Sequence, residues 1–168
     1  MLIVSIALAT MGALLGFLRW NWPGGKIFLG DGGAYLLGFI LAELSVLLVM
    51  RNPGVSPWLP LLFLIYPVFE TLFSIYRKKI LNGHSPGLPD SQHLHMLIYN
   101  YVVPREAREL GALERNNRVA KYLLAPAAIF STIGILFWTS TSVLVVFSIL
   151  FCLCYIAIYH RIAESMPD

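Results

Sequence analysis

The sequence has few charged residues, since Asp, Glu, Lys and Arg make up only 12% of its 168 positions. Hydrophobic residues make up 58%, and the mean hydropathy is +0.73. So little charge excludes an ordinary water-soluble domain. Cysteine is also scarce: Cys152 and Cys154 are two positions apart, which on a helix points them to different faces and disfavours a disulfide or a metal site. We therefore expect an all-α, polytopic membrane protein.

Five segments are long and apolar enough to cross a bilayer, whose hydrocarbon core of about 30 Å needs roughly 20 helical residues. The expected spans are residues 1–18, 33–50, 58–76, 122–138 and 142–160. The last two come from one long run without Asp, Glu, Lys or Arg, from Tyr122 to His160. The polar stretch Thr139-Ser140-Thr141-Ser142 interrupts this run, so a tight hairpin is expected there.

Basic residues are distributed unevenly between the two sides of this topology. With alternating spans, 11 of the 12 Lys and Arg residues fall on one side, and Arg51 alone falls on the other. The 11 are Arg19, Lys26, the eight between Arg77 and Lys121, and Arg161. Because cytoplasmic loops retain basic residues, loops 19–32 and 77–121 are predicted to be cytoplasmic. Basicity of this kind reports topology, so we expect no nucleic-acid partner.

The first cytoplasmic loop is rich in glycine and leads directly into the second span. Residues 21–34 read Asn-Trp-Pro-Gly-Gly-Lys-Ile-Phe-Leu-Gly-Asp-Gly-Gly-Ala. Glycines at a helix start let an anion approach the free backbone amides, and the helix dipole favours that anion. Asp31 adds an oxygen ligand, and a carboxylate beside bound phosphates is a common way to hold Mg²⁺. The alternative is that Asp31 only caps the helix.

The second cytoplasmic loop holds three of the four histidines, His84, His93 and His95. They follow the basic run at residues 77–79, and this combination indicates an anionic ligand at the membrane surface. Alternatively, the basic run only fixes topology and attracts anionic lipid headgroups. A lone His-x-His pair is a weak indication of zinc, so we expect a phosphate contact instead.

The backbone conformation around His93 and His95 stays open at this point. Residues two apart point to the same side of an extended segment and in nearly opposite directions on a helix. Both histidines therefore reach one ligand easily only on an extended backbone. Asp90 and Ser91 are good N-cap residues, however, and predict that a helix begins nearby.

Two acidic residues, Glu43 and Glu70, lie inside expected spans. Charge at membrane depth is costly and normally faces the protein interior, so both are functional candidates. Glu70 precedes Arg77 by about two helical turns, which lets it approach the membrane interface or pair with a basic neighbour. Glu43 lies nearer the middle of its span, where protonation or an internal partner is expected.

Two long segments fit the motifs of one enzyme family. The first segment contributes Asn21, Pro23, Lys26, Ile27, Phe28, Gly30, Asp31, Gly33 and Gly38. The second contributes Pro67, the acid at Glu70, Arg77, Gly83, Ser85, Pro86, Pro89, Asp90, His93 and His95. On these residues the chain resembles the C-terminal half of the polyprenyl-phosphate N-acetylhexosamine-1-phosphate transferases, in glycosyltransferase family 4. These include bacterial enzymes that start O-antigen and teichoic-acid linkage synthesis.

The resemblance implies transfer of a sugar 1-phosphate from a UDP-N-acetylhexosamine to undecaprenyl phosphate, with release of UMP. This is the first membrane step of cell-surface polysaccharide synthesis, in the bacterial inner membrane. Carried over by position, Asp31 binds Mg²⁺, with Mn²⁺ as the alternative ion, and His93 and His95 are catalytic residues that contact the diphosphate. The substrate-binding residues expected in the same way are Asn21, Lys26, Gly30, Gly33, Arg77, His84 and Asp90.

The family pattern also implies parts that this chain does not contain. Family members have further spans and an Asp-Asp pair in an earlier cytoplasmic loop, whereas no two aspartates are adjacent here. We therefore expect residues 1–168 to be the C-terminal part of a transferase whose N-terminal half is missing, with a separate chain or a homodimer as partner. His84, Ser91 and Met96 replace residues that the family uses. They favour the alternative of an inactive truncated homologue that serves as a binding or assembly partner.

Overall fold

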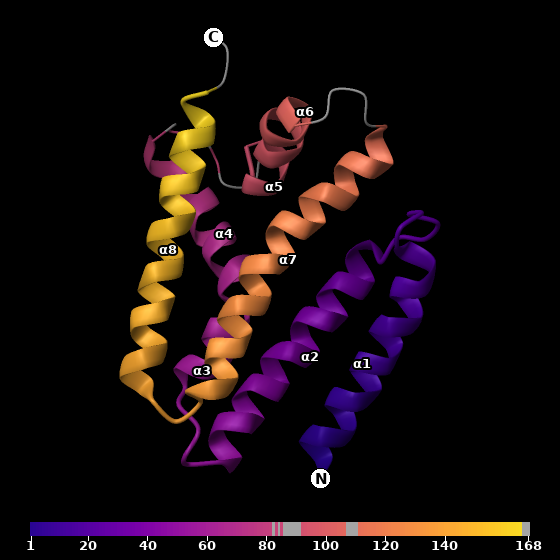
Figure 1. Cartoon of the computed structure of the whole chain (residues 1–168). Helices are drawn as coiled ribbons and strands as arrows, with labels where there is room; N and C mark the ends of the chain where they lie inside the picture. Colours follow the sequence, from indigo (N-terminus) through magenta and orange to yellow (C-terminus); the bar gives the residue numbers. More distant parts are fainter. Residues whose placement is uncertain (82, 84, 86–91, 107–110, 166–168) are drawn as a thin grey trace. The chain divides into compact units, whose positions relative to one another are not determined.

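The computed structural model describes residues 1–81, 83, 85, 92–106 and 111–165 (Figure 1). These residues form helices and turns, with no strand among them, which confirms the all-α class. The chain divides into two compact units, residues 1–57 and 58–168. Within the described ranges, four helices are long and apolar enough to cross a membrane.

The first unit consists of two apolar helices in contact with each other, α1 (Leu2–Asn21) and α2 (Gly30–Arg51). They correspond to the expected spans at 1–18 and 33–50, and each extends a few residues beyond one predicted boundary. Neither helix contains a buried residue. Large side chains such as Leu15 and Phe39 are exposed, as expected for helices surrounded by lipid or by further helices.

The expected third span, 58–76, is wrong as one continuous helix. The segment forms α3 (Trp58–Phe63), α4 (Ile65–Tyr76) and a π-helical turn, η1 (Arg77–Leu81). Pro67 explains the break at Leu64, because proline has no N–H to donate to the carbonyl of Phe63 and its ring crowds that carbonyl. Helical hydrogen bonding reaches the break itself, where the N–H of Leu64 donates to the carbonyl of Pro60 at 3.1 Å.

The remaining elements of the second unit end in a helical hairpin. They are α5 (Leu94–Leu97), η2 (Ile98–Val102), α6 (Val103–Glu106), α7 (Ala112–Leu136) and α8 (Thr141–Ala163). Helices α7 and α8 run antiparallel (Figure 1), and the N–H of Ser140 donates to the carbonyl of Phe137 at 2.9 Å in the turn between them. The expected hairpin is confirmed. Helix α7 begins well before residue 122, because apolar composition marks only the membrane part of a helix.

Aromatic rings pack α8 against α4 in the core of the second unit. The rings of Phe73 and Tyr159 lie 4.9 Å apart at 69°, and those of Phe69 and Tyr155 lie 5.1 Å apart at 78°. Edge-to-face pairs of this kind are favourable beyond the area that they bury. This packing fixes α8 beside the segment that carries Glu70.

Gly134 allows α7 to approach α3. A Cβ at this position would lie 2.8 Å from Cε1 of Phe63 and 3.1 Å from Cδ1 of Leu59. Leu59 is buried and has little room to move. We expect Gly134→Val to destabilise the second unit by about 1–3 kcal/mol, measured by thermal unfolding in detergent. Gly12→Val in α1, where nothing lies within 4 Å, is the matched control; equal losses would contradict this packing role.

Candidate active site

The glycine-rich loop folds back onto the end of α1. The side-chain amide of Asn21 donates to the carbonyl of Ile27 at 2.8 Å, and the N–H of Gly25 donates to the carbonyl of Asn21 at 2.6 Å. The ammonium group of Lys26 lies over the ring of Trp20, 5.9 Å from its centroid, which is within cation–π range. Asn21 and Lys26 therefore shape the loop, and their expected contacts with a substrate stay predictions.

Asp31 lies exposed in the first turn of α2. The N-cap residue of this helix is Leu29, so the alternative in which Asp31 serves as the cap is wrong. Gly30 has a φ of +67°, a left-handed conformation that favours glycine. At Gly33 a Cβ would lie 2.8 Å from the side chain of Leu29. The two glycines thus permit the tight helix start that presents Asp31.

The position of Asp31 fits one ligand of a Mg²⁺ ion. Magnesium usually keeps several waters and binds through one or two carboxylates together with substrate phosphates. The exposed carboxylate of Asp31 lies at a helix N-terminus, which is receptive to phosphate. In the part of the chain that the structure describes, no three His, Cys, Asp or Glu side chains gather into a complete metal site. Further ligands would have to come from phosphates, water or other residues.

Glu70 is the centre of a hydrogen-bond network in the second unit. It is 9% exposed. Its Oε1 lies 2.9 Å from Nδ1 of His93 and accepts from the N–H of Leu94 at 3.1 Å, and its Oε2 accepts from the hydroxyl of Tyr155 at 2.6 Å. A buried carboxylate is costly unless it is hydrogen-bonded, and here both oxygens have donors. Of the two alternatives for Glu70, the structure shows pairing with a neighbour, His93, and this pair is ionic only when the imidazole is protonated.

His93 and His95 lie side by side. Helix α5 begins at Leu94, and His93 is its N-cap residue in an extended conformation, with φ −66° and ψ 147°. The helix therefore does start nearby, with His93 as its N-cap, and the predicted N-cap residues Asp90 and Ser91 lie outside the described residues. The two imidazole rings are nearly parallel, at 13°, and their centroids are 5.7 Å apart. The extended residue before the helix thus brings both rings to one side.

Arg77 is buried, with 6% of the residue exposed. Its Nη1 donates to Oε1 of Gln92, and the guanidinium lies 5.8 Å from the centroid of the Tyr159 ring. A buried Arg77 is not available to lipid headgroups, whereas Lys79 is exposed, and the alternative that the basic run fixes topology stays a prediction. Arg77 holds the residue directly before His93. The expected site residues His84 and Asp90 lie outside the described residues.

His95 has a lowered pKa. Partial burial is the main cause, the charge of Glu70 opposes it, and His93 lowers the pKa further. Because the unfolded chain takes up this proton more readily, His95 contributes stability above its ordinary pKa of about 6.5, and that contribution is lost as the pH falls through this value towards the folded pKa. His95→Gln should therefore reduce the loss of thermal stability between about pH 7.5 and about pH 5.5. A larger loss in the variant would contradict the sign.

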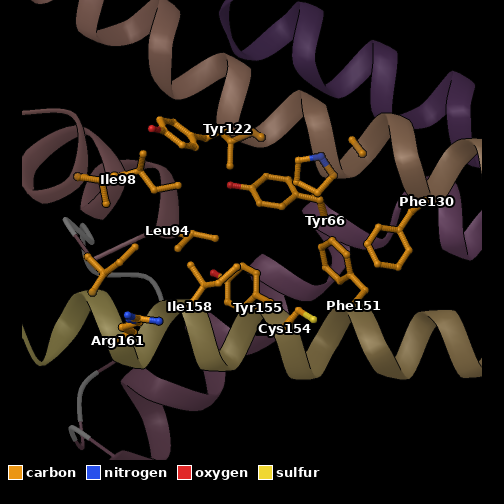
Figure 2. A pocket seen from close by; sticks show the side chains of 15 residues that line it. Tyr66, Leu94, Ile98, Tyr122, Phe130, Phe151, Cys154, Tyr155, Ile158 and Arg161 are labelled. Carbon is orange, nitrogen blue, oxygen red and sulfur yellow. The ribbon is translucent and has the colours of Figure 1, made fainter. Parts of the chain in front are cut away.

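A cavity of about 330 Å³ lies beside the Glu70 network, between α7, α8 and the segment of α5 and η2 (Figure 2). Its wall is mostly apolar, with the hydroxyl of Tyr66 directed into the space and Arg161 at one end (Figure 2). This volume is typical of small-molecule sites. Leu94 and Tyr155 belong both to this wall and to the Glu70 network. The shape of the cavity and the position of His93 therefore depend on the same packing.

The structure gathers the expected residues into two groups, one in each unit. The first unit holds Asn21, Lys26, Gly30, Asp31 and Gly33, and the second brings together Arg77, His93 and His95. Sequence reasoning missed Gln92, Tyr155 and Tyr159. Tyr155 and Glu70 are 85 positions apart, and only the packing of α8 joins them. The one available signal was an acidic residue at membrane depth.

The fold and these two groups define an all-α membrane protein with polar residues suited to a phosphate-bearing ligand. Residues 1–49 match the model of the family described as Glycosyl transferase family 4. This match covers α1, the glycine-rich loop, Asp31 and most of α2. The resemblance that the motifs indicated is thereby confirmed for part of the chain.

Named relatives extend this similarity. A "Probable undecaprenyl-phosphate N-acetylglucosaminyl 1-phosphate transferase" of Bacillus subtilis is 38% identical over 95 residues, which cover 56% of this chain and 26% of the relative. An "Undecaprenyl-phosphate alpha-N-acetylglucosaminyl 1-phosphate transferase" of Thermotoga maritima is 37% identical over 83 residues, covering 49% and 27%. A "Decaprenyl-phosphate N-acetylglucosaminephosphotransferase" of Mycolicibacterium smegmatis is 35% identical over 105 residues, covering 55% and 25%.

The matched part of the chain corresponds to about a quarter of the length of these curated relatives. No solved structure matches the chain. The chain is thus a partial match to glycosyl transferase family 4 and to relatives named as N-acetylglucosaminyl 1-phosphate transferases.

Proposed function

We propose that the chain is the C-terminal part of a transferase that moves a sugar 1-phosphate from a UDP-N-acetylhexosamine to undecaprenyl phosphate. An oxygen of the lipid phosphate attacks the sugar-bearing phosphorus of the UDP-sugar. The new P–O bond forms as the bond to the UMP phosphate breaks, and UMP leaves with the released negative charge. The other half of the site comes from an N-terminal part of the protein, a separate chain or a second copy.

In this proposal the residues of the first unit bind Mg²⁺ and position the substrate phosphates. Asp31 would hold Mg²⁺, which when bound neutralises phosphate charge and polarises the phosphoryl oxygens. The glycine-flanked start of α2 offers backbone N–H groups to phosphate oxygens. The observation that carries the proposal is this exposed carboxylate, placed at such a helix start within the segment that matches the family model.

The residues of the second unit contact the diphosphate. His93 and His95 present two parallel rings on one side, and each ring can donate a hydrogen bond to a phosphate oxygen through a nitrogen that carries a proton. Because two polyanions must meet, such donors and cations lower the barrier by holding the reactants together and by stabilising charge. Both loops are proposed to lie on the cytoplasmic side of the inner membrane, where UDP-sugars are available, and the concentration of basic residues in loops 19–32 and 77–121 supports this orientation.

The test combines the chain with the N-terminal half of a relative. The chain is produced in membranes together with the N-terminal half of the Bacillus subtilis relative, and transfer of labelled N-acetylglucosamine phosphate from UDP-N-acetylglucosamine to undecaprenyl phosphate is measured. We expect label in the lipid fraction and an equal amount of UMP when both halves are present, and neither product with one half alone. Tight UDP-sugar binding without turnover would contradict the transferase and support an inactive binding partner.

A further inference from the structure

His93 contacts a buried acidic residue, Glu70, to which the proposed function gives no role. Nδ1 of His93 lies 2.9 Å from Oε1 of Glu70. A carboxylate only accepts hydrogen bonds, so Nδ1 must carry a proton in this contact. The neutral ring is then the Nδ1–H form, with its lone pair on Nε2. The opposite nitrogen, Nε2, is turned away from Glu70.

The carboxylate is itself held from two further elements. The N–H of Leu94, at the start of α5, donates to the same Oε1 at 3.1 Å, and the hydroxyl of Tyr155 in α8 donates to Oε2 at 2.6 Å. Tyr155 is only 3% exposed and is packed edge-on against Phe69 and Phe73. Glu70 therefore cannot rotate freely to follow the imidazole. The orientation of the ring is imposed by the helices.

A contact that only joined α4, α5 and α8 would not require a buried carboxylate. Burying a carboxylate away from water is costly, and an apolar side chain of similar size could join the same helices. A carboxylate that accepts from an imidazole is, in contrast, a common way to fix the tautomer and orientation of a histidine that acts on a ligand. The cost of burial therefore indicates a function for the pair.

We infer that Glu70 is a positioning residue, which holds His93 with a proton on Nδ1 and turns its Nε2 toward the substrate phosphates. When substrate binds, Nε2 takes up a proton from water and donates it in a hydrogen bond to a phosphate oxygen. Tyr155 only adds a donor to the other oxygen of Glu70. The role of Nε2 rests on the proposed function, whereas the tautomer does not. His95, stacked on His93, keeps the ring from tilting out of this orientation. The proton on Nδ1 of His93 is therefore expected even in the absence of substrate.

The test is the tautomer of His93 in the full chain, labelled with ¹⁵N-histidine in lipid nanodiscs. Long-range ¹H–¹⁵N spectra are recorded about two pH units above the ordinary histidine pKa of about 6.5, and His93→Gln assigns the signal. We expect a protonated Nδ1 and an unprotonated Nε2. A wild-type His93 in the Nε2–H form would overturn the proposal without the need for any further variant.

Two variants sharpen this result. Glu70→Leu removes the acceptor, and we expect loss of the Nδ1–H signal in favour of the Nε2–H form that an imidazole prefers in water. Tyr155→Phe is the matched control, because it removes one donor to Oε2 and leaves the contact at Oε1; its signal should stay Nδ1–H. Circular dichroism checks that both variants keep their helices. An unchanged tautomer in folded Glu70→Leu would overturn the proposal.

UDP addition separates this inference from the proposed function. In the wild type, UDP should shift the Nε2 signal of His93, and in Glu70→Leu this shift should be lost. If the Nδ1–H form is observed and UDP causes no shift in the presence of the complementary half, the phosphate contact of the proposed function is contradicted, while the Glu70–His93 pair stands.

Discussion

Replacement of Asp31 by asparagine should lower the rate of sugar 1-phosphate transfer by about 10²-fold or more in the reunited protein. Asparagine keeps the size of the side chain but removes its charge, so the affinity for Mg²⁺ falls. Metal-ion stabilisation of a transferring phosphoryl group contributes several kcal/mol, and each 1.4 kcal/mol is about tenfold in rate. The initial rate of lipid labelling measures this effect.

The control for this variant lies on the same helix. Glu43 is also an exposed acid of α2, but it is about three turns away from Asp31. Glu43→Gln makes the same change of charge and should leave transfer within about twofold of the wild type. Raising the Mg²⁺ concentration should restore part of the rate in Asp31→Asn. Full activity of Asp31→Asn at low Mg²⁺ would remove this carboxylate from the mechanism.

Replacement of Glu70 by alanine should destabilise the second unit by about 3 kcal/mol, since truncation leaves several buried donors without an acceptor. These donors are Nδ1 of His93, the N–H of Leu94 and the hydroxyl of Tyr155. The measurement is the free energy of unfolding in mixed detergent micelles. Glu43→Ala, at an exposed position, should change this free energy by no more than about 0.5 kcal/mol. Similar losses in the two variants would mean that the network carries no net stability.

The sequence predicted the parts of this protein that depend on local composition. Four of five spans and the hairpin near Ser140 follow from the lengths of apolar runs and one polar interruption, which act within a single helix or turn. The break at Leu64 follows from Pro67, which is likewise a local signal in the sequence. The start of α7 at Ala112 could not be read from hydropathy, because polar residues continue a helix beyond the membrane.

The candidate site was predictable as a set of residues and not as an arrangement. Motifs named His93 and His95, but the conformation between them depends on a helix that begins at Leu94. Glu70 stands out in the sequence because an acid inside a long apolar run is unusual. Its bond to Tyr155 depends on two helices that pack together from distant parts of the chain, and no local pattern encodes that contact. Tertiary packing supplied what the motifs could not.

Helix α7 is longer than a membrane span requires. Its 25 residues give a helix of about 37 Å at 1.5 Å per residue, which exceeds a hydrocarbon core of about 30 Å by more than one turn. The end that carries Glu114 and Arg115 is the polar one, so it is this end that projects from the lipid. Helix α7 is thus long enough for its first turns to extend beyond the hydrocarbon core into the aqueous layer.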